Sequence, residues 1–142
     1  MTIEISTDPA RLDIALIHSF LSEESPWAKG ISRERVARAL EHSLCFSAHD
    51  GARQVGLARV VTDRATYAWL ADVFVLASER GRGISVMLMD AVVVHPDLQG
   101  LRRFSLVTST ASGLYARYRF TPLARPEIAM ELVNPDAYAP PS

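Results

Sequence analysis

The sequence predicts an α/β fold in which a mixed, mostly antiparallel central sheet is flanked by helices on both faces. Short runs of apolar, β-branched and aromatic residues alternate along the chain with runs of helical periodicity. Three predicted strands follow one another with turn residues between them, which indicates an antiparallel meander. The helix predicted over residues 84–95 is apolar around most of its circumference, which indicates burial between layers.

The N-terminal third of the chain predicts one strand and two helices. Residues 2–6 alternate weakly between polar and apolar, as in a short strand. A capping side chain followed by Pro9 predicts a helix that starts there and runs to about residue 21. Ser32 is a suitable cap for a second helix, whose apolar side includes Val36 and Leu40.

The remaining elements complete the sheet and its cover. Strands are predicted over residues 44–48, 54–62, 67–75, 103–108 and 128–133, and helices over 84–95 and 111–118. Pro96 ends the first of these helices. The proline-rich end has no core-forming pattern, so we expect one domain over residues 1–133 and a tail over 134–142.

Composition excludes several classes of protein. The 142 residues suit one domain, and 49% of them are hydrophobic, which is enough for a core. A net charge of −1 predicts neither a positively charged surface that would bind nucleic acid nor a polybasic patch that would bind a membrane. Without a signal-peptide pattern, a membrane-length apolar run or paired cysteines, the sequence predicts a cytoplasmic protein. We interpret Cys45 as a small buried hydrophobe rather than a nucleophile, and scattered histidines predict no metal site.

The turn at residues 80–85, with the sequence RGRGIS, indicates an anion site. A strand leads into it and a helix begins from it, so unpaired helix N–H groups and the positive end of the dipole lie there. Gly81 and Gly83 allow an oxyanion to approach the backbone, and the arginines add donors suited to phosphate. The turn lacks the Lys-Ser or Lys-Thr of a P-loop and the third glycine of a dinucleotide fingerprint. An ordinary surface turn is the alternative.

This turn resembles the acetyl-CoA-binding motif of the GNAT superfamily of N-acetyltransferases. That motif, R/Q-x-x-G-x-G/A, follows the fourth strand of the family fold and opens its third helix. Downstream, LYARYRF at residues 114–120 is similar to the family element L-Y-x-x-x-G-F. Ser85 replaces the last small residue of the first motif, and Arg119 replaces the glycine of the second, where a positive φ would strain an arginine.

The resemblance implies acetyl-CoA as cofactor and a role for particular residues. The amides of the turn would hold the pyrophosphate of coenzyme A, and the backbone of Phe74 and Val75 would pair with its pantetheine arm. Tyr115 would protonate or hydrogen-bond the departing thiolate. The turn residues concerned are Arg80, Gly81, Arg82, Gly83, Ile84 and Ser85.

The reaction implied is direct transfer of an acetyl group to a primary amine. Asp72 borders the cofactor strand and is the candidate base, although a solvated or capping aspartate is an equal interpretation. Glu23, Glu24 and Trp27 lie in a loop that shapes the acceptor site in relatives, and they could hold a cationic amine. An acidic surface loop with a packed tryptophan is the alternative. The acceptor, a small molecule or a peptide, is left open, and a homodimer is a possible assembly.

Two other functions remain open at this point. The first is a non-catalytic acyl-CoA-binding or sensing module on the same fold, which the substitutions at Ser85 and Arg119 favour. The second is a structural interaction domain, which predicts no coenzyme A binding.

Overall fold

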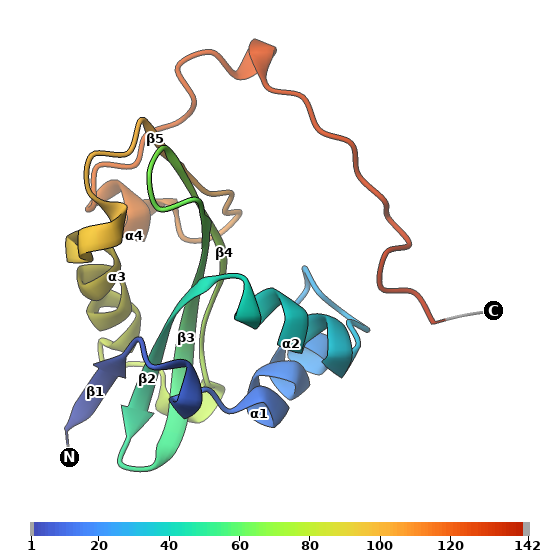
Figure 1. Ribbon diagram of the computed structural model, residues 1–142, viewed down its shortest axis with the longest axis vertical. Coiled ribbons are helices and arrows are strands. Elements are labelled where there is room, and N and C mark those ends of the chain that lie inside the picture. Colours follow the sequence, from blue (N-terminus) through green and yellow to red (C-terminus); the bar gives the residue numbers. More distant parts are fainter. Residues whose placement is uncertain (1, 141–142) are drawn as a thin grey trace.

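A computed structural model describes residues 2–140, so residue 1 of the predicted domain and residues 141–142 of the predicted tail lie outside it. Five strands form one sheet in the order β1-β2-β3-β4-β5 (Figure 1). Their bounds are Ile3–Ser6 (β1), Leu44–Asp50 (β2), Arg53–Thr62 (β3), Tyr67–Val75 (β4) and Arg103–Ser105 (β5). Neighbours are antiparallel except β4 and β5, which are parallel. The predicted mixed, mostly antiparallel sheet is confirmed.

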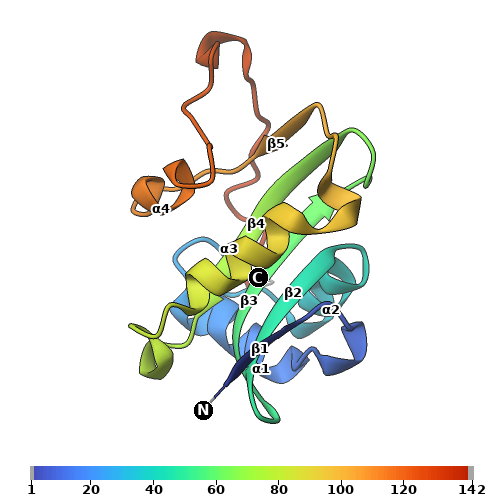
Figure 2. The same cartoon turned by 90° about the vertical axis from the view of Figure 1, so that its left-hand side faces the viewer.

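Helices cover both faces of this sheet, as predicted. Helix α3 (Ile84–Val94) lies across one face, and helices α1 (Ile14–Ser19) and α2 (Arg33–Glu41) lie on the other (Figures 1 and 2). Two apolar clusters result, one under α3 and one under α1 and α2. Because β2 and β3 separate the clusters, their side chains are buried on both faces, which explains their nearly continuous apolar sequence.

The helix predicted over residues 9–21 is divided. A 3₁₀ turn (Pro9–Arg11) comes first, and α1 begins only after Asp13, whose side chain accepts a 3.0 Å hydrogen bond from the Leu16 amide. A second cap therefore restarts the helix, and α1 continues into a wider π-helical turn (Phe20–Glu24).

Other helix boundaries follow the expected local signals. Ser32 accepts a 3.2 Å hydrogen bond from the Arg35 amide and caps α2, as predicted. Helix α3 begins directly after Gly83, and His95 is already extended ahead of Pro96. Two further 3₁₀ turns, Ala77–Glu79 and Pro96–Leu98, flank α3 along the chain.

The C-terminal prediction is partly wrong. Strand β5 is shorter than the predicted 103–108, and helix α4 (Ser112–Ala116) is shorter than the predicted 111–118. The strand predicted over residues 128–133 is absent: a 3₁₀ turn (Pro126–Ile128) is followed by irregular backbone. A strand is stable only when it pairs with another strand. In the described part of the chain, residues 128–133 lie away from the sheet and pair with none of its strands.

Candidate functional site

Strands β4 and β5 separate part-way along their length. They pair only from Tyr67 to Trp69, so the edge of β4 from Leu70 onward has no partner on that side in the described chain. The register with β3 also shifts here, because Arg59 pairs with Asp72 while the next residue pairs with Leu70. The extra residue in β4 is a β-bulge, which bends the strand and increases its twist. The sheet therefore opens between β4 and β5, its last two strands.

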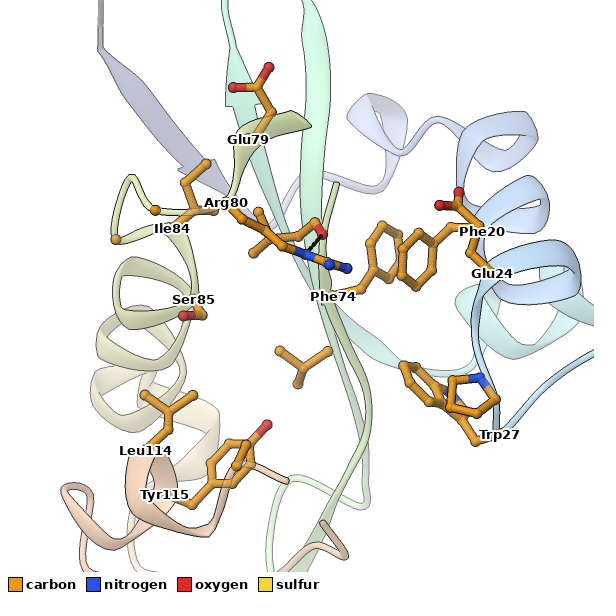
Figure 3. A pocket seen from close by; sticks show the side chains of 16 residues that line it. Phe20, Glu24, Trp27, Phe74, Glu79, Arg80, Ile84, Ser85, Leu114 and Tyr115 are labelled. Carbon is orange, nitrogen blue, oxygen red and sulfur yellow. Dashed lines mark hydrogen bonds between the residues drawn. The ribbon is translucent and has the colours of Figure 1, made fainter. Parts of the chain in front are cut away.

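A cleft of about 450 Å³ lies at this opening (Figure 3). One wall is the end of β4, and another is the turn at residues 80–85 with the start of α3. Helix α4 and the loop after α1 complete it, through Tyr115 and Trp27 respectively. Elements far apart in the sequence thus meet around one concave surface, the usual form of a small-molecule site.

The turn presents unpaired backbone donors to the cleft. Gly81 and Gly83 have positive φ values of 85° and 75°, a conformation that favours glycine. A Cβ atom at either position would meet nothing within 4 Å, so space next to the backbone is left open. Gly83 provides no side-chain cap, and the first amides of α3 keep their free hydrogens. This arrangement can hold an anionic group.

The two arginines of the turn have different surroundings. Arg80 lines the cleft, and its Nε donates a 3.3 Å hydrogen bond to the carbonyl of Val75 (Figure 3). Arg82 points elsewhere: its guanidinium donates to Asp50 at 3.1 Å and to Glu79 at 2.5 Å. Only Arg80 therefore offers its charge to the cleft, and Arg82 contributes its backbone to the turn.

Tyr115 is buried, and its hydroxyl points into the cleft (Figure 3). Burial raises the pKa of this phenol, which therefore stays protonated at neutral pH and can donate. Helix α4 ends directly after it, and Arg119 takes a φ of 72° where the resemblance implied a glycine. The backbone turn of the family element is thus present with an arginine in it, at a cost of roughly 1–2 kcal/mol. The anticipated strain is confirmed.

Phe74 and Val75 lie on the open edge of β4. The Phe74 ring is stacked on Phe20, with ring centroids 4.0 Å apart and an angle of 10° between the planes. The stack closes the cleft on the side of α1 (Figure 3). No described strand pairs with the β5 side of β4 here, although the Val75 carbonyl accepts from Arg80 Nε, so this edge is suited to an extended ligand.

A family model for the acetyltransferase (GNAT) domain matches residues 41–122, more than half of the 142-residue chain. This chain belongs to the GNAT acetyltransferase family. The matched segment contains the open strand, the turn and Tyr115. The resemblance inferred from the sequence is confirmed.

Several known proteins are similar to this GNAT chain. A provisionally named acetyltransferase of Gibberella zeae is 29% identical over 135 residues, covering 80% of this chain and 75% of its own. A solved structure described as belonging to the GNAT family, from Xanthomonas campestris pv. campestris, is 56% identical with a TM-score of 0.95, covering 99% of both chains. A predicted acetyltransferase of Clostridium acetobutylicum, crystallised with acetyl-CoA, shares the fold at 16% identity and a TM-score of 0.67, covering 93% of this chain and 96% of that one.

Asp72 lies beside the cleft of this GNAT domain but not in its lining. One carboxylate oxygen accepts a 2.7 Å hydrogen bond from Trp27 Nε1, and the other accepts a 2.6 Å bond from Arg59 Nε. Both oxygens are thus engaged in a nearly buried network. Each oxygen retains a further lone pair, so a base role would fall to a carboxylate that two donors already hold in place. The side chains of this network line a second hollow of about 360 Å³ beside the first.

The acidic residues predicted for the acceptor are separated. Glu24 lines the cleft together with Trp27, whereas Glu23 does not. Glu23 is exposed and accepts a 3.4 Å hydrogen bond from Ser19, one turn earlier. Of this predicted group, the structure therefore brings only Glu24 and Trp27 to the cleft.

Sequence reasoning missed two contributors to the site. Arg59 was not singled out, although a lone arginine inside an otherwise apolar strand indicates a buried partner. Phe20 lies within the first predicted helix, and nothing in the sequence connects it to Phe74, more than fifty residues away.

The remaining reactive groups lie outside the cleft. Cys45 is buried, and burial raises the pKa of its thiol to about 11, so a thiolate is scarce at neutral pH. Within residues 2–140 there is no group of three or more potential metal ligands. No helix in that range is long and apolar enough to cross a membrane.

Proposed function

We propose that this GNAT protein is an acetyl-CoA-dependent N-acetyltransferase that transfers the acetyl group directly to a primary amine. One observation carries the proposal: the buried Tyr115 hydroxyl faces the same cleft as the turn at residues 80–85. A phosphate-suited turn alone would support binding. A protonated phenol in the same cleft as that turn supports chemistry as well.

The cleft residues fit coenzyme A. Amides of the turn, from Arg80 to Ser85, would hold the pyrophosphate, because Gly81 and Gly83 leave the space beside them open. The Arg80 guanidinium would add its charge there. The open backbone of Phe74 and Val75 would hydrogen-bond the amide groups of the pantetheine arm, as an added strand does. The relative from Clostridium acetobutylicum was crystallised with acetyl-CoA, which supports this assignment by fold.

The chain's own residues would then handle charge and protons. Bound acetyl-CoA supplies a thioester carbonyl for the amine to attack. Tyr115 would donate its proton or a hydrogen bond to the sulfur as the carbon–sulfur bond breaks. The buried, protonated Cys45 offers no acyl acceptor, which supports direct transfer rather than an acyl-enzyme.

The acceptor amine would enter between the loop after α1 and β4. Glu24 and the Trp27 ring line the cleft there and could hold a cationic amine through charge and ring face. The amine must lose a proton before it attacks, and Asp72 remains the proposed base. Its two hydrogen bonds give it a second proposed role, which is to fix Trp27 and Arg59 in place. A single cysteine excludes a disulfide within the chain, which suits a reducing compartment, and we propose the cytoplasm as the place of this reaction.

The alternative is a non-catalytic acyl-CoA-binding module. The engagement of both Asp72 oxygens favours it, because the carboxylate beside the cofactor strand already binds the Trp27 and Arg59 side chains and so has a structural role without catalysis. Two measurements separate the proposals. Titration calorimetry with acetyl-CoA tests binding, and release of free thiol across a panel of primary amines tests transfer. Binding with amine-dependent thiol release supports the enzyme, binding alone supports the module, and no binding contradicts both.

A further inference from the structure

The second hollow, of about 360 Å³, lies beside the cleft on the side of α2. Its volume falls within the range of small-molecule pockets, which is roughly 300–1,000 Å³. Trp27 lines both the cleft and the second hollow, and it lies across the cleft from Tyr115 (Figure 3). A molecule bound in the second hollow can therefore extend past Trp27 to the place where acetyl transfer is proposed.

Most of the wall of the second hollow is apolar. Helix α2 contributes the buried side chains of Val36 and Leu40, and β4 contributes the half-buried Trp69. The chain has two tryptophans, Trp27 and Trp69, and both line this space. Such a wall favours a ligand with an aromatic or bulky apolar body, because the ligand and the wall then remove each other's apolar surface from water.

The charged side chains of the second hollow do not balance. They are Arg35, Arg59 and Asp72. Arg59 and Asp72 compensate each other through a hydrogen-bonded ion pair of 2.6 Å. Arg35 is exposed on α2, and it forms no ion pair with any residue that the structure describes. One guanidinium is therefore left at the rim of the hollow to bind an anion.

The neighbouring arginines of α2 have other surroundings. Arg33 and Arg38 are also exposed, but neither lines the second hollow, and Arg38 pairs with Glu34 at 3.6 Å. The one uncompensated charge of Arg35 matches a monoanion. A carboxylate carries a single charge and can accept from a guanidinium through both oxygens, whereas a phosphate group carries about 1.5–2 charges at neutral pH. The charge of the hollow thus favours a carboxylate.

We propose that the second hollow binds the body of the acceptor, and that this acceptor is a primary amine with an aromatic or bulky apolar body and a carboxylate. Arg35 binds the carboxylate, the apolar wall surrounds the body, and the amino group extends past Trp27 into the cleft. The nitrogen bonds to the acetyl carbon as the carbon–sulfur bond breaks, so the amine loses one proton and the sulfur gains one. This inference rests on the proposed transfer reaction and names the class of amine that it uses.

The first experiment measures binding without any transfer reaction. Because both tryptophans line the second hollow, a ligand that fills it should change the intrinsic tryptophan fluorescence. The probes are para-toluate, which has a ring and a carboxylate but no amine, and para-toluamide, its neutral analogue. We expect a saturable change with para-toluate at an affinity about fivefold higher than for para-toluamide, the size expected for an exposed ion pair.

Two arginine variants test the position of the charge. Arg35→Gln should weaken the binding of para-toluate by about fivefold and leave the binding of para-toluamide unchanged. Arg33→Gln is the matched control, because it removes the same charge from the same helix outside the lining of the hollow, and it should bind both probes normally. Both side chains are exposed, so circular dichroism should show the same fold for the two variants.

The second experiment measures thiol release from acetyl-CoA with para-aminomethylbenzoate and with para-aminomethylbenzamide. The carboxylate should raise kcat/KM by about fivefold in the wild type and in Arg33→Gln, and this advantage should be absent from Arg35→Gln.

The two experiments separate this inference from the proposed function. Thiol release from amines without a preference for the carboxylate, or equal losses in Arg35→Gln and Arg33→Gln, would overturn the inference and leave the transfer reaction standing. Arg35-dependent binding of para-toluate with no thiol release from any amine would overturn the proposed function, and with it the role of the second hollow in binding an acceptor.

Discussion

Trp27 donates a 2.7 Å hydrogen bond from its indole nitrogen to Oδ1 of Asp72, and so joins the loop after α1 to the bulged region of β4. The other oxygen of Asp72 accepts from Arg59, whose side chain is only 17% exposed. Two donors from two other elements therefore share the Asp72 carboxylate beside the cleft. This network gives the first prediction.

Asp72→Ala should lower the free energy of unfolding by about 3–5 kcal/mol, because it leaves the nearly buried Arg59 guanidinium without a counter-charge and with the Ser43 hydroxyl as its remaining partner. Urea denaturation measures the loss. Asp97→Ala is the control, since its ion pair with Arg64 is exposed and should be worth about 1 kcal/mol at most. Equal, small losses for the two variants would contradict a structural role for the network.

A base role for Asp72 is tested by two variants that divide its interactions. Asp72→Asn removes the proton acceptor and retains an oxygen for Trp27, whereas Trp27→Phe removes the hydrogen bond and retains the carboxylate. If Asp72 is the base, Asp72→Asn should lower kcat by about 10²–10⁴-fold and Trp27→Phe should mainly raise the KM of the amine. The reverse pattern would assign Asp72 to positioning alone.

Arg80→Gln should weaken coenzyme A binding by about 1.5–3 kcal/mol, the usual worth of a charged hydrogen bond. Arg82→Gln should have a much smaller effect, because Asp50 and Glu79 already hold that guanidinium away from the cleft. Calorimetry with coenzyme A and with pantetheine, which lacks the pyrophosphate, measures both. Loss of pantetheine affinity in Arg80→Gln as large as that for coenzyme A would refute the pyrophosphate assignment.

Gly83→Val should abolish coenzyme A binding, since a branched side chain would fill the space beside the free amides. The substitution also strains the backbone, whose φ is 75°. Gly100→Val provides the matched control, with a φ of 71°, open space around it and no place in the cleft. Both variants should lose similar stability in urea. Normal coenzyme A binding by Gly83→Val would mean that Gly83 serves only to allow the positive φ of the turn.

The fold was predictable where its signals are local. Periodicity indicated the meander and the apolar α3, and side-chain caps marked where helices begin, as at Ser32. The prediction of one N-terminal helix is wrong because Asp13 is a second cap inside the predicted segment. The strand over 128–133 was predicted from the alternation of apolar and other residues alone. Such alternation indicates that a segment is suited to strand pairing, but it does not indicate which strand the segment pairs with.

The candidate site was predictable from motifs and not from contacts. The turn and Tyr115 lie on the cleft as expected, because a strand, a turn and a helix start are sequential features. Arg82 looked equivalent to Arg80, but its neighbours Asp50 and Glu79 determine its direction, and Asp50 is 32 residues away. The Asp72 network likewise depends on β3 pairing with β4, a relationship between segments that no short motif records.

Tyr115→Phe decides between enzyme and binding module. The hydroxyl is lost and the buried ring stays, so acetyl-CoA affinity should be nearly unchanged. If the hydroxyl acts on the sulfur only as the bond breaks, turnover should fall by about 10²–10⁴-fold. The loss should be smaller for thioesters whose thiol is a better leaving group.

The pH profile of turnover provides a further test of Tyr115 as the proton donor. The protonated phenol is the active form, and burial raises its pKa above the usual 10. Any alkaline decline due to Tyr115 should therefore have its midpoint above the usual pKa of a tyrosine in the wild type, and Tyr115→Phe should lack it. The control is Tyr118→Phe, because the Tyr118 hydroxyl lies 2.7 Å from Asp90 on α3 and outside the cleft lining. That variant should keep its turnover and lose about 1 kcal/mol of stability. Turnover of Tyr115→Phe within about twofold of wild type, far below the range for a general acid, would assign the proton to water instead.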